Sequence, residues 1–194
     1  MTQTTAYSVD AFIDDVRDIF DSTEDPLAQA SGVAERMELL LKTPGWLEER
    51  LELPDEGGFG RYDLHLDEDY GHPGGGFWLM ASVQKPEQDN LPHDHGNAWV
   101  VYGVYDGAIK QTKWRWFYPG EGVDSIQLQE TGDFTQKESK VAFFLPGEIH
   151  NTLNVTEGRA DGRAVVVRLE SQKLDRITRY QYNPDEGTMV VMDR

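Results

Sequence analysis

Apolar positions recur at a helical period through the first part of the chain, which predicts helices within residues 1–54. One apolar face runs from Val9 to Phe20 and a second from Val33 to Leu41. The start signals are a capping residue or a capping residue followed by proline, and they stand at Ser8, Asp25-Pro26 and Thr43-Pro44. The third signal predicts a short helix that carries Trp46 and ends at Pro54.

The pattern changes to short β-prone runs from Arg61 onward. About ten runs alternate with turn residues, from RYDLHL at the start through SIQLQE at 125–130 to TMVVM at the end. Strands at this spacing predict an antiparallel sandwich or barrel over residues 60–192. The helices cannot bury their apolar faces alone, so we expect them to pack outside that barrel in one domain of residues 1–194.

Charge and composition indicate which classes of partner and which metal ligands are expected. The formal net charge is −17, from 18 basic and 35 acidic residues, and this predicts that the protein binds neither nucleic acid nor an anionic membrane. No apolar run approaches the roughly 18 residues of a membrane span. The N-terminus lacks the order of a signal peptide, so a cytoplasmic location is expected. Unpaired sheet edges would allow a homo-oligomer. Cysteine is absent, so His, Asp or Glu must hold any metal.

Three histidines form a candidate metal site. The stretch LPHDHGNAWVVYGVYDG holds His93 and His95 two positions apart, and in a strand these side chains face the same side. The stretch FFLPGEIHNTLN places His150 on a strand after a Pro-Gly turn. Asn154 shares the face of His150 and is expected to support it by hydrogen bonding.

These stretches resemble the two cupin motifs, with PHDH in the first and the P-G-x-x-H-x-x-x-N spacing in the second. The resemblance implies a small β-barrel or jelly roll, the double-stranded β-helix of cupins. The positions of the glutamate in the usual first motif hold Trp99 and Val100. The resulting set of three histidines without a carboxylate resembles the thiol dioxygenases, which include cysteine dioxygenase and 3-mercaptopropionate dioxygenase. KTPGWL, RYDLHLDED and FWLMASV extend this resemblance over about residues 35 to 185.

The resemblance also implies roles for other residues. In cysteine dioxygenases an arginine holds the substrate carboxylate, and a loose match of RYDLHLD places Arg61 there. The family's Ser-x-His-x-Tyr triad is missing, because VVVRLES carries Arg168 and Glu170 in that region. Arg168 is therefore either a second substrate-binding arginine or the ion-pair partner of Glu170. Tyr62 and Tyr102 are weaker candidates for a catalytic hydroxyl near the metal.

Four further residues carry minor expectations. His65 shares the face of Arg61 on an extended strand and would line the pocket, whereas His72 in the glycine-rich loop would be solvated. Trp114 and Trp116 alternate with charged residues, so they share one face and are expected in the core.

The leading functional hypothesis is a non-haem Fe(II) dioxygenase. It would use O2 to oxidise a small thiol carboxylate, such as cysteine or 3-mercaptopropionate, to a sulfinic acid. Three neutral imidazoles leave a divalent ion its full charge and leave open positions for an anionic substrate and O2. Fe(II) is implied by the resemblance, since the same ligands also suit Zn(II). Two alternatives stay open: a three-histidine cupin that cleaves diketones, and a non-catalytic cupin that binds a small acid.

Overall fold

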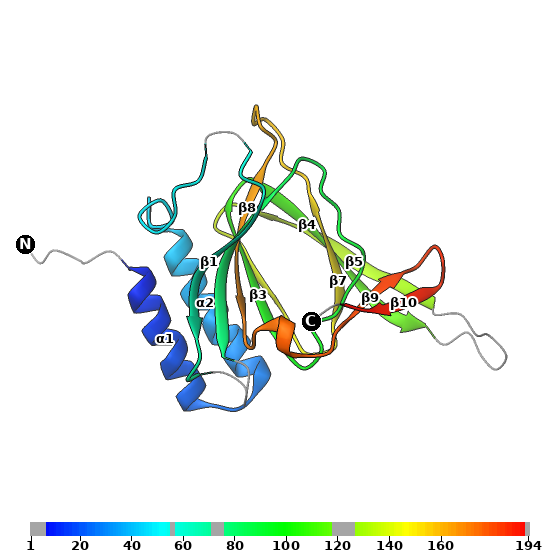
Figure 1. Cartoon of the computed structure of the whole chain (residues 1–194), viewed down its shortest axis with the longest axis horizontal. Helices are drawn as coiled ribbons and strands as arrows, with labels where there is room; N and C mark the ends of the chain where they lie inside the picture. Colours follow the sequence, from blue (N-terminus) through cyan, green and yellow to red (C-terminus); the bar gives the residue numbers. More distant parts are fainter. Residues whose placement is uncertain (1–6, 55–56, 71–75, 118–126, 193–194) are drawn as a thin grey trace, which may run out of the picture.

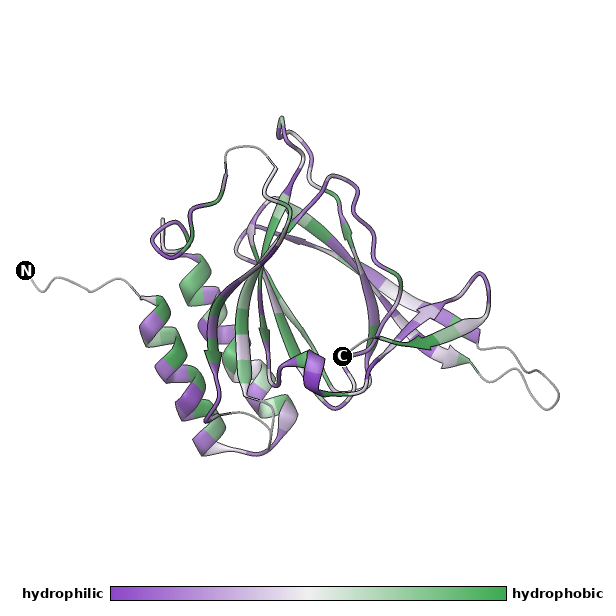
Figure 2. Ribbon diagram, viewed as in Figure 1, coloured by the Kyte–Doolittle hydropathy of each residue, from purple (hydrophilic) through white to green (hydrophobic). Residues whose placement is uncertain are grey.

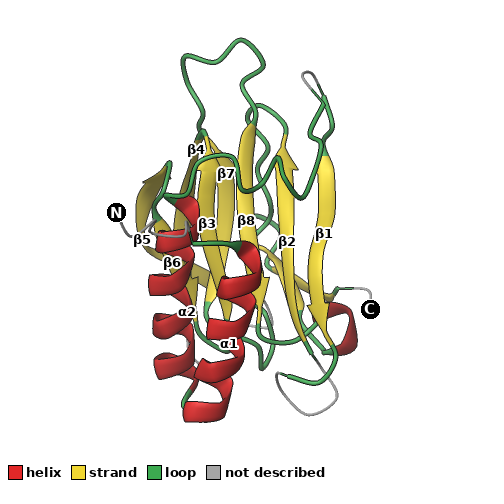
Figure 3. Ribbon diagram, turned by 90° about the vertical axis from the view of Figure 1, so that its left-hand side faces the viewer, coloured by secondary structure: helices red, strands yellow, loops and turns green. Residues whose placement is uncertain are grey.

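Two antiparallel sheets face each other, and two helices cover the outer face of the larger sheet (Figures 1 and 3). The computed structural model describes residues 7–54, 57–70, 76–117 and 127–192. None of the helices in these ranges has the length and hydropathy that a membrane crossing requires.

Both predicted helices form where their capping signals place them. Helix α1 spans Val9–Ser22, and the Ser8 side chain accepts a hydrogen bond from the backbone N–H of Ala11 at 3.2 Å. Helix α2 spans Pro26–Leu41, and the Asp25 carboxylate accepts hydrogen bonds from two N–H groups of its first turn. These caps satisfy N–H groups that have no partner within the helix.

The short third helix predicted after Thr43-Pro44 is wrong. The chain forms consecutive turns there, and Gly45 has a φ of +74°, outside the helical region. Trp46 and Leu47 are nevertheless buried, with 2% and 0% of their surface exposed. The apolar pattern therefore identified core residues correctly but assigned them the wrong backbone.

Ten strands lie within the described residues. The larger sheet contains, in spatial order, β1 (Gly60–Asp67), β2 (Phe77–Gln84), β8 (Ala164–Glu170), β3 (Val100–Asp106) and β6 (Val141–Phe144). The facing sheet contains β5 (Gln127–Lys137), β4 (Ala108–Phe117) and β7 (Ile149–Asn154). A short 3₁₀ helix, η1 (Leu174–Arg176), precedes the hairpin of β9 (Tyr180–Asn183) and β10 (Thr188–Val191).

Strand β5 is longer than the predicted run at 125–130. It continues past Gly132, whose φ is +147°. The register of its pairing with β4 shifts between Lys113 and Trp114 of β4. Residues 125 and 126 lie outside the described residues. Thr131 has no register partner on β4, so the sequence next to Gly132 that resembles a turn contains a bulge within a continuing strand.

Two apolar clusters lie on opposite faces of the larger sheet. One packs the outer face against α1 and α2, and the other fills the space between the sheets with Val100, Tyr102, Val104, Ile109, Phe144, Ala164 and Val166. Figure 2 shows mainly hydrophobic residues along the strands that the helices cover. The predicted fold class is confirmed: the core is a cupin double-stranded β-helix with N-terminal helices packed outside.

Candidate metal centre

His93 and His95 lie in an irregular segment that precedes β3, not in the strand that the sequence predicts. Gly96 has a φ of +57° and turns the chain immediately after them. His93 forms isolated antiparallel bridges with His150 of β7 and with Gln181 of β9, and the backbones of His93 and His150 share hydrogen bonds of 2.9 and 3.0 Å. These bridges to β7 and β9, and not a regular strand, hold the segment in place.

The structure brings the three histidines together inside the barrel. One ring nitrogen of each lies within 4.8 Å of the others, and no Asp or Glu of the described residues joins the cluster. The Nε2 atoms of His95 and His150 are 2.8 Å apart. A metal–nitrogen distance of about 2.0–2.1 Å separates two ligands of one ion by about 3 Å, so this spacing suits a metal ion.

Burial favours the neutral form of all three imidazoles. His95 and His150 are fully buried, and His93 is 9% exposed. Burial lowers the pKa of each ring, and Arg168 lowers it further. For His93 the pKa falls to about 4, although the carbonyl of Leu91 opposes the shift. A metal ligand must be deprotonated, so these rings are in the form that binds.

Hydrogen bonds orient two of the three rings. The Nδ1 atom of His93 donates to the carbonyl of Leu91 at 3.0 Å, because a carbonyl oxygen only accepts. The Nδ1 atom of His150 donates to Oε1 of Gln111 at 2.8 Å for the same reason. Both rings therefore present the lone pair of Nε2 to the shared space. The buried Nδ1 of His95 has no hydrogen-bond partner among the described residues.

Gln111 is the residue that sequence analysis missed. Its Oε1 also accepts from Thr152 at 3.0 Å, and its Nε2 donates to Gln136 at 3.0 Å. The expected support from Asn154 is wrong, since its Nδ2 donates to backbone carbonyls at residues 85 and 162, at 2.8 and 2.9 Å. Gln111 lies on β4, which pairs with β7, so only the sheet pairing reveals the contact.

The two tyrosines have different surroundings. The hydroxyl of Tyr102 lies 3.3 Å from Nε2 of His95 and 3.5 Å from Nε2 of His150. The hydroxyl of Tyr62 instead donates to the carbonyl of Gly58 at 2.5 Å, and its ring packs against the cluster on the helix side. The structure thus places Tyr102 at the site and keeps Tyr62 away from it. The expectation for Tyr62 is corrected because successive strand residues face opposite sides of the sheet.

A cavity of about 90 Å³ opens beside the histidines. Its lining residues are Arg61, Ser82, Gln84, Gln88, Asn90, His93, Tyr102, Thr152, Val166 and Arg168. Both predicted arginines therefore line one cavity with His93. The volume corresponds to about three water molecules, so the enclosed space holds about one carboxylate group, and a larger ligand must extend toward solvent beside the exposed Arg61.

Arg168 combines the two arrangements that the sequence left open. It faces inward, with its guanidinium carbon 5.8 Å from the centre of the Tyr102 ring. It also forms an ion pair with Glu170, which is fully buried and accepts the N–H of Leu174 at 3.2 Å. Burial raises the pKa of Glu170, against the opposing effect of Arg168.

The structure contradicts the expectations for His65 and Trp116. A register shift after Asp63 turns His65 toward the ring of Phe77, 5.6 Å away, and His65 does not line the cavity. His72 lies outside the described residues. Trp114 is half-buried, but Trp116 is 48% exposed, so the expected core position of Trp116 is wrong. The partner strand β7 reaches Trp114 but not Trp116.

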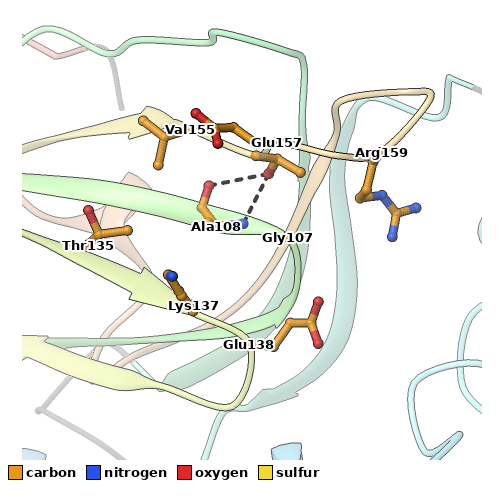
Figure 4. A pocket seen from close by; sticks show the side chains of 9 residues that line it. Gly107, Ala108, Thr135, Lys137, Glu138, Val155, Glu157 and Arg159 are labelled. Carbon is orange, nitrogen blue, oxygen red and sulfur yellow. Dashed lines mark hydrogen bonds between the residues drawn. The ribbon is translucent and has the colours of Figure 1, made fainter.

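A larger hollow of about 650 Å³ lies elsewhere, between β4, β5 and the segment after β7 (Figure 4). Figure 4 shows Lys137, Glu138, Glu157 and Arg159 around it, and no histidine lines it. Arg159 already forms ion pairs with two aspartates. The hollow shares no residue with the histidine site.

No family model matches this chain, and no curated protein matches it. The cupin domain of Schizosaccharomyces pombe Cnp3 has 10% identity and a TM-score of 0.43, over 63% of this chain and 68% of that domain. A Klebsiella pneumoniae protein with a double-stranded β-helix domain has 14% identity and a TM-score of 0.40, over 76% and 89%. An oxalate oxidase in complex with glycolate has 17% identity and a TM-score of 0.41, over 74% and 60%.

Similarities of this size carry no argument about ligand or activity. The fold follows from the strand order of the chain itself, and the candidate site follows from its own geometry. The chain has the double-stranded β-helix fold that cupins share, with a buried cluster of three histidines that suits a metal ion.

Proposed function

We propose that this cupin is an Fe(II)-dependent dioxygenase that oxidises a small thiol carboxylate to a sulfinic acid. One observation carries the proposal: three neutral imidazoles without a carboxylate converge beside a small cavity that two arginines line. Such a ligand set leaves the charge of the ion to be neutralised by an anionic ligand. The arginines provide a second attraction for the same anion.

Iron, when bound, would supply the positions at which a thiolate and O2 react, with one O2 consumed per thiol: RS⁻ + O2 gives RSO2⁻. Iron is part of the proposal because of the resemblance to thiol dioxygenases, since three histidines also suit zinc. Metal reconstitution tests this part, with Fe(II), Zn(II) or Mn(II) added separately to metal-free protein. We expect oxygen uptake only with Fe(II).

The residues of this chain divide the remaining work. His93, His95 and His150 hold the ion, and Gln111 fixes the ring of His150 through the bond at 2.8 Å. Arg168 and Arg61 pair with the substrate carboxylate from the cavity wall. The Tyr102 hydroxyl, 3.3 Å from the nearest imidazole nitrogen, can donate a hydrogen bond to a ligand beside the ion.

Packing around the site limits the access of water. The ring of Phe144 stacks on His150 with centroids 3.7 Å apart, and both side chains are fully buried. Tyr102 packs edge-on against Phe144 at 5.8 Å. One wall of the site is therefore apolar, and the cations lie on another, so a bound substrate has a defined orientation.

The deciding experiment measures oxygen uptake and sulfinate formation by iron-loaded protein. The panel contains cysteine, 3-mercaptopropionate, mercaptosuccinate and cysteamine, with a diketone for contrast. His150→Ala serves as the blank, and His65→Gln serves as a matched control, because His65 does not line the cavity. Metal content is measured for each variant.

We expect uptake with a carboxylate-bearing thiol, loss of both iron and uptake in His150→Ala, and little change in His65→Gln. Full iron content and activity in His150→Ala would refute the metal site. Stable iron binding without oxygen uptake in the presence of any of the thiols would refute the thiol chemistry. Uptake with the diketone alone would move the assignment to the diketone-cleaving alternative.

A further inference from the structure

The candidate site carries a surplus of positive charge in an acidic protein. Arg61, Arg168 and Arg179 interact electrostatically with one another and with Glu170. Arg61 and Arg168 line the same cavity, and Glu170 pairs with Arg168, although the whole chain has a net charge of −17. Two guanidinium groups that line one cavity with no carboxylate among its lining residues attract an anion, so this cluster points to an anionic ligand.

The Glu170 carboxylate forms its ion pair with Arg168, not with Arg61 or Arg179. No Asp or Glu of the described residues forms an ion pair with Arg61. The Nε atoms of Arg168 and Arg179 are buried and have no hydrogen-bond partner in the described part of the chain. Arg168 is the main cause of the lowered pKa of Arg61, with burial second.

The cavity wall contains a neutral hydrogen-bond acceptor, because the buried Oε1 of Gln84 has no hydrogen-bond partner among the described residues, but it contains no negative charge. No carboxylate is among its ten lining residues, which include the two arginines, one neutral histidine and several hydroxyl and amide side chains. A substrate ammonium would therefore meet like charges and no counter-ion. A carboxylate would find a guanidinium that can bind it with two parallel hydrogen bonds.

We propose that the substrate of this site is a short thiol with two carboxylates and no amino group, held by Arg168 and Arg61. This inference rests on the function proposed above and adds the class of thiol. Arg168 receives one carboxylate close to the histidines, next to Tyr102. Arg61, on the edge strand β1 and exposed to solvent, receives the second carboxylate at the outer end of the cavity.

The first test compares kcat/KM of the iron-loaded protein for mercaptosuccinate, 3-mercaptopropionate and cysteine. Arg61→Gln removes the outer guanidinium, Arg61→Lys keeps the charge, and Arg115→Gln is the matched control on an exposed arginine of β4. We expect wild-type kcat/KM for mercaptosuccinate to exceed that for the other two thiols at least tenfold. We expect Arg61→Gln to reduce this preference at least tenfold, Arg61→Lys to reduce it less, and Arg115→Gln to preserve it.

The second test uses no thiol and no metal. Calorimetric titration of metal-free protein compares succinate, propionate and β-alanine. We expect succinate to bind at least tenfold more tightly than the other two, and to lose this advantage in Arg61→Gln but not in Arg115→Gln. Thermal melts verify that each variant is folded.

The outcomes separate this inference from the proposed function. Thiol oxidation with a preference for cysteine or 3-mercaptopropionate would refute the dicarboxylate class and leave the proposed function standing. A preference for mercaptosuccinate that Arg61→Gln does not change would refute the role of Arg61. Without any thiol oxidation the proposed function fails, and succinate binding alone then decides whether the arginines form a dicarboxylate site. Equal binding of succinate and propionate would refute that site.

Discussion

Replacement of Gln111 by leucine tests whether the candidate metal centre depends on a residue that holds no metal itself. Gln111 is fully buried, and its amide contacts His150, Thr152 and Gln136 at 2.8, 3.0 and 3.0 Å. Gln136 in turn donates to the backbone carbonyl of Tyr102 at 3.1 Å. Leucine fills most of the same volume but leaves three buried polar groups without partners.

The expected magnitude follows from these three contacts. A buried hydrogen bond contributes about 1 kcal/mol net, and an orphaned polar group costs about 1–3 kcal/mol. We therefore expect Gln111→Leu to lower the free energy of unfolding of the metal-free protein by about 3 kcal/mol. Loss of the bond that orients a ligand ring weakens metal binding by about 10- to 100-fold. Urea denaturation measures the first quantity, and chelator competition measures the second.

Two further variants separate stability from ring orientation. Gln111→Glu keeps an acceptor for His150 and Thr152 but cannot donate to Gln136, so it should lose stability and retain metal affinity. Gln129→Leu is the surface control, because Gln129 is exposed on β5, and it should change stability by about 0.5 kcal/mol or less. Metal affinity within about twofold of wild type in Gln111→Leu would refute the orienting role.

Three other predictions concern the fold that holds the site. The pKa of His93 falls from 6.5 to about 4 on folding, so between these values the unfolded chain binds a proton that the folded chain does not. The metal-free protein should therefore lose at least about 2 kcal/mol between pH 7 and pH 5, because the pKa values of His95 and His150 are also lowered; equal stability in urea titrations at both pH values would contradict this. Gly96→Ala should cost at least about 2 kcal/mol, because a Cβ there would overlap the carbonyl oxygen of Thr178 at a φ of +57°; a thermal melt unchanged from wild type would show that the turn adapts. Asp25→Ala should cost about 1 kcal/mol through the loss of two capping hydrogen bonds, and an unchanged urea midpoint would show that the cap contributes nothing.

Local signals in the sequence predicted the parts of the fold that depend on local contacts. Ser8 and Asp25 mark the starts of α1 and α2 because their side chains bond to N–H groups three or fewer residues away. The same reasoning failed at Gly45, where a capping signal and apolar residues were followed by turns. It failed again at Gly132, where pairing with β4 carries the strand through a glycine. In both places the backbone depends on contacts that lie far away in the sequence.

The candidate site divides in the same way. The spacing of His93, His95 and His150 was visible in the sequence, and the structure brings the three together. Gln111 was not visible, because its contact with His150 spans 39 residues and arises from the pairing of β4 with β7. Arg179 was missed for a similar reason, since it belongs to the segment between η1 and β9 and no motif marks it.

The lack of a carboxylate among the described metal-binding candidates and the arginines of the cavity both favour an anionic ligand. Of the two positions that a first-motif glutamate would occupy, Trp99 donates its indole N–H to Gln29 of α2 at 3.0 Å, and Val100 packs in the apolar cluster between the sheets. Glu170 cannot replace that glutamate as a source of negative charge, because its carboxylate already forms an ion pair with Arg168 and accepts a hydrogen bond from the backbone N–H of Leu174. Negative charge for a divalent ion and for Arg61 must therefore come from the ligand. A neutral substrate or a zwitterion with one carboxylate would leave Arg61 or Arg168 without a carboxylate partner in the cavity, whereas a dicarboxylate thiol would supply one to each.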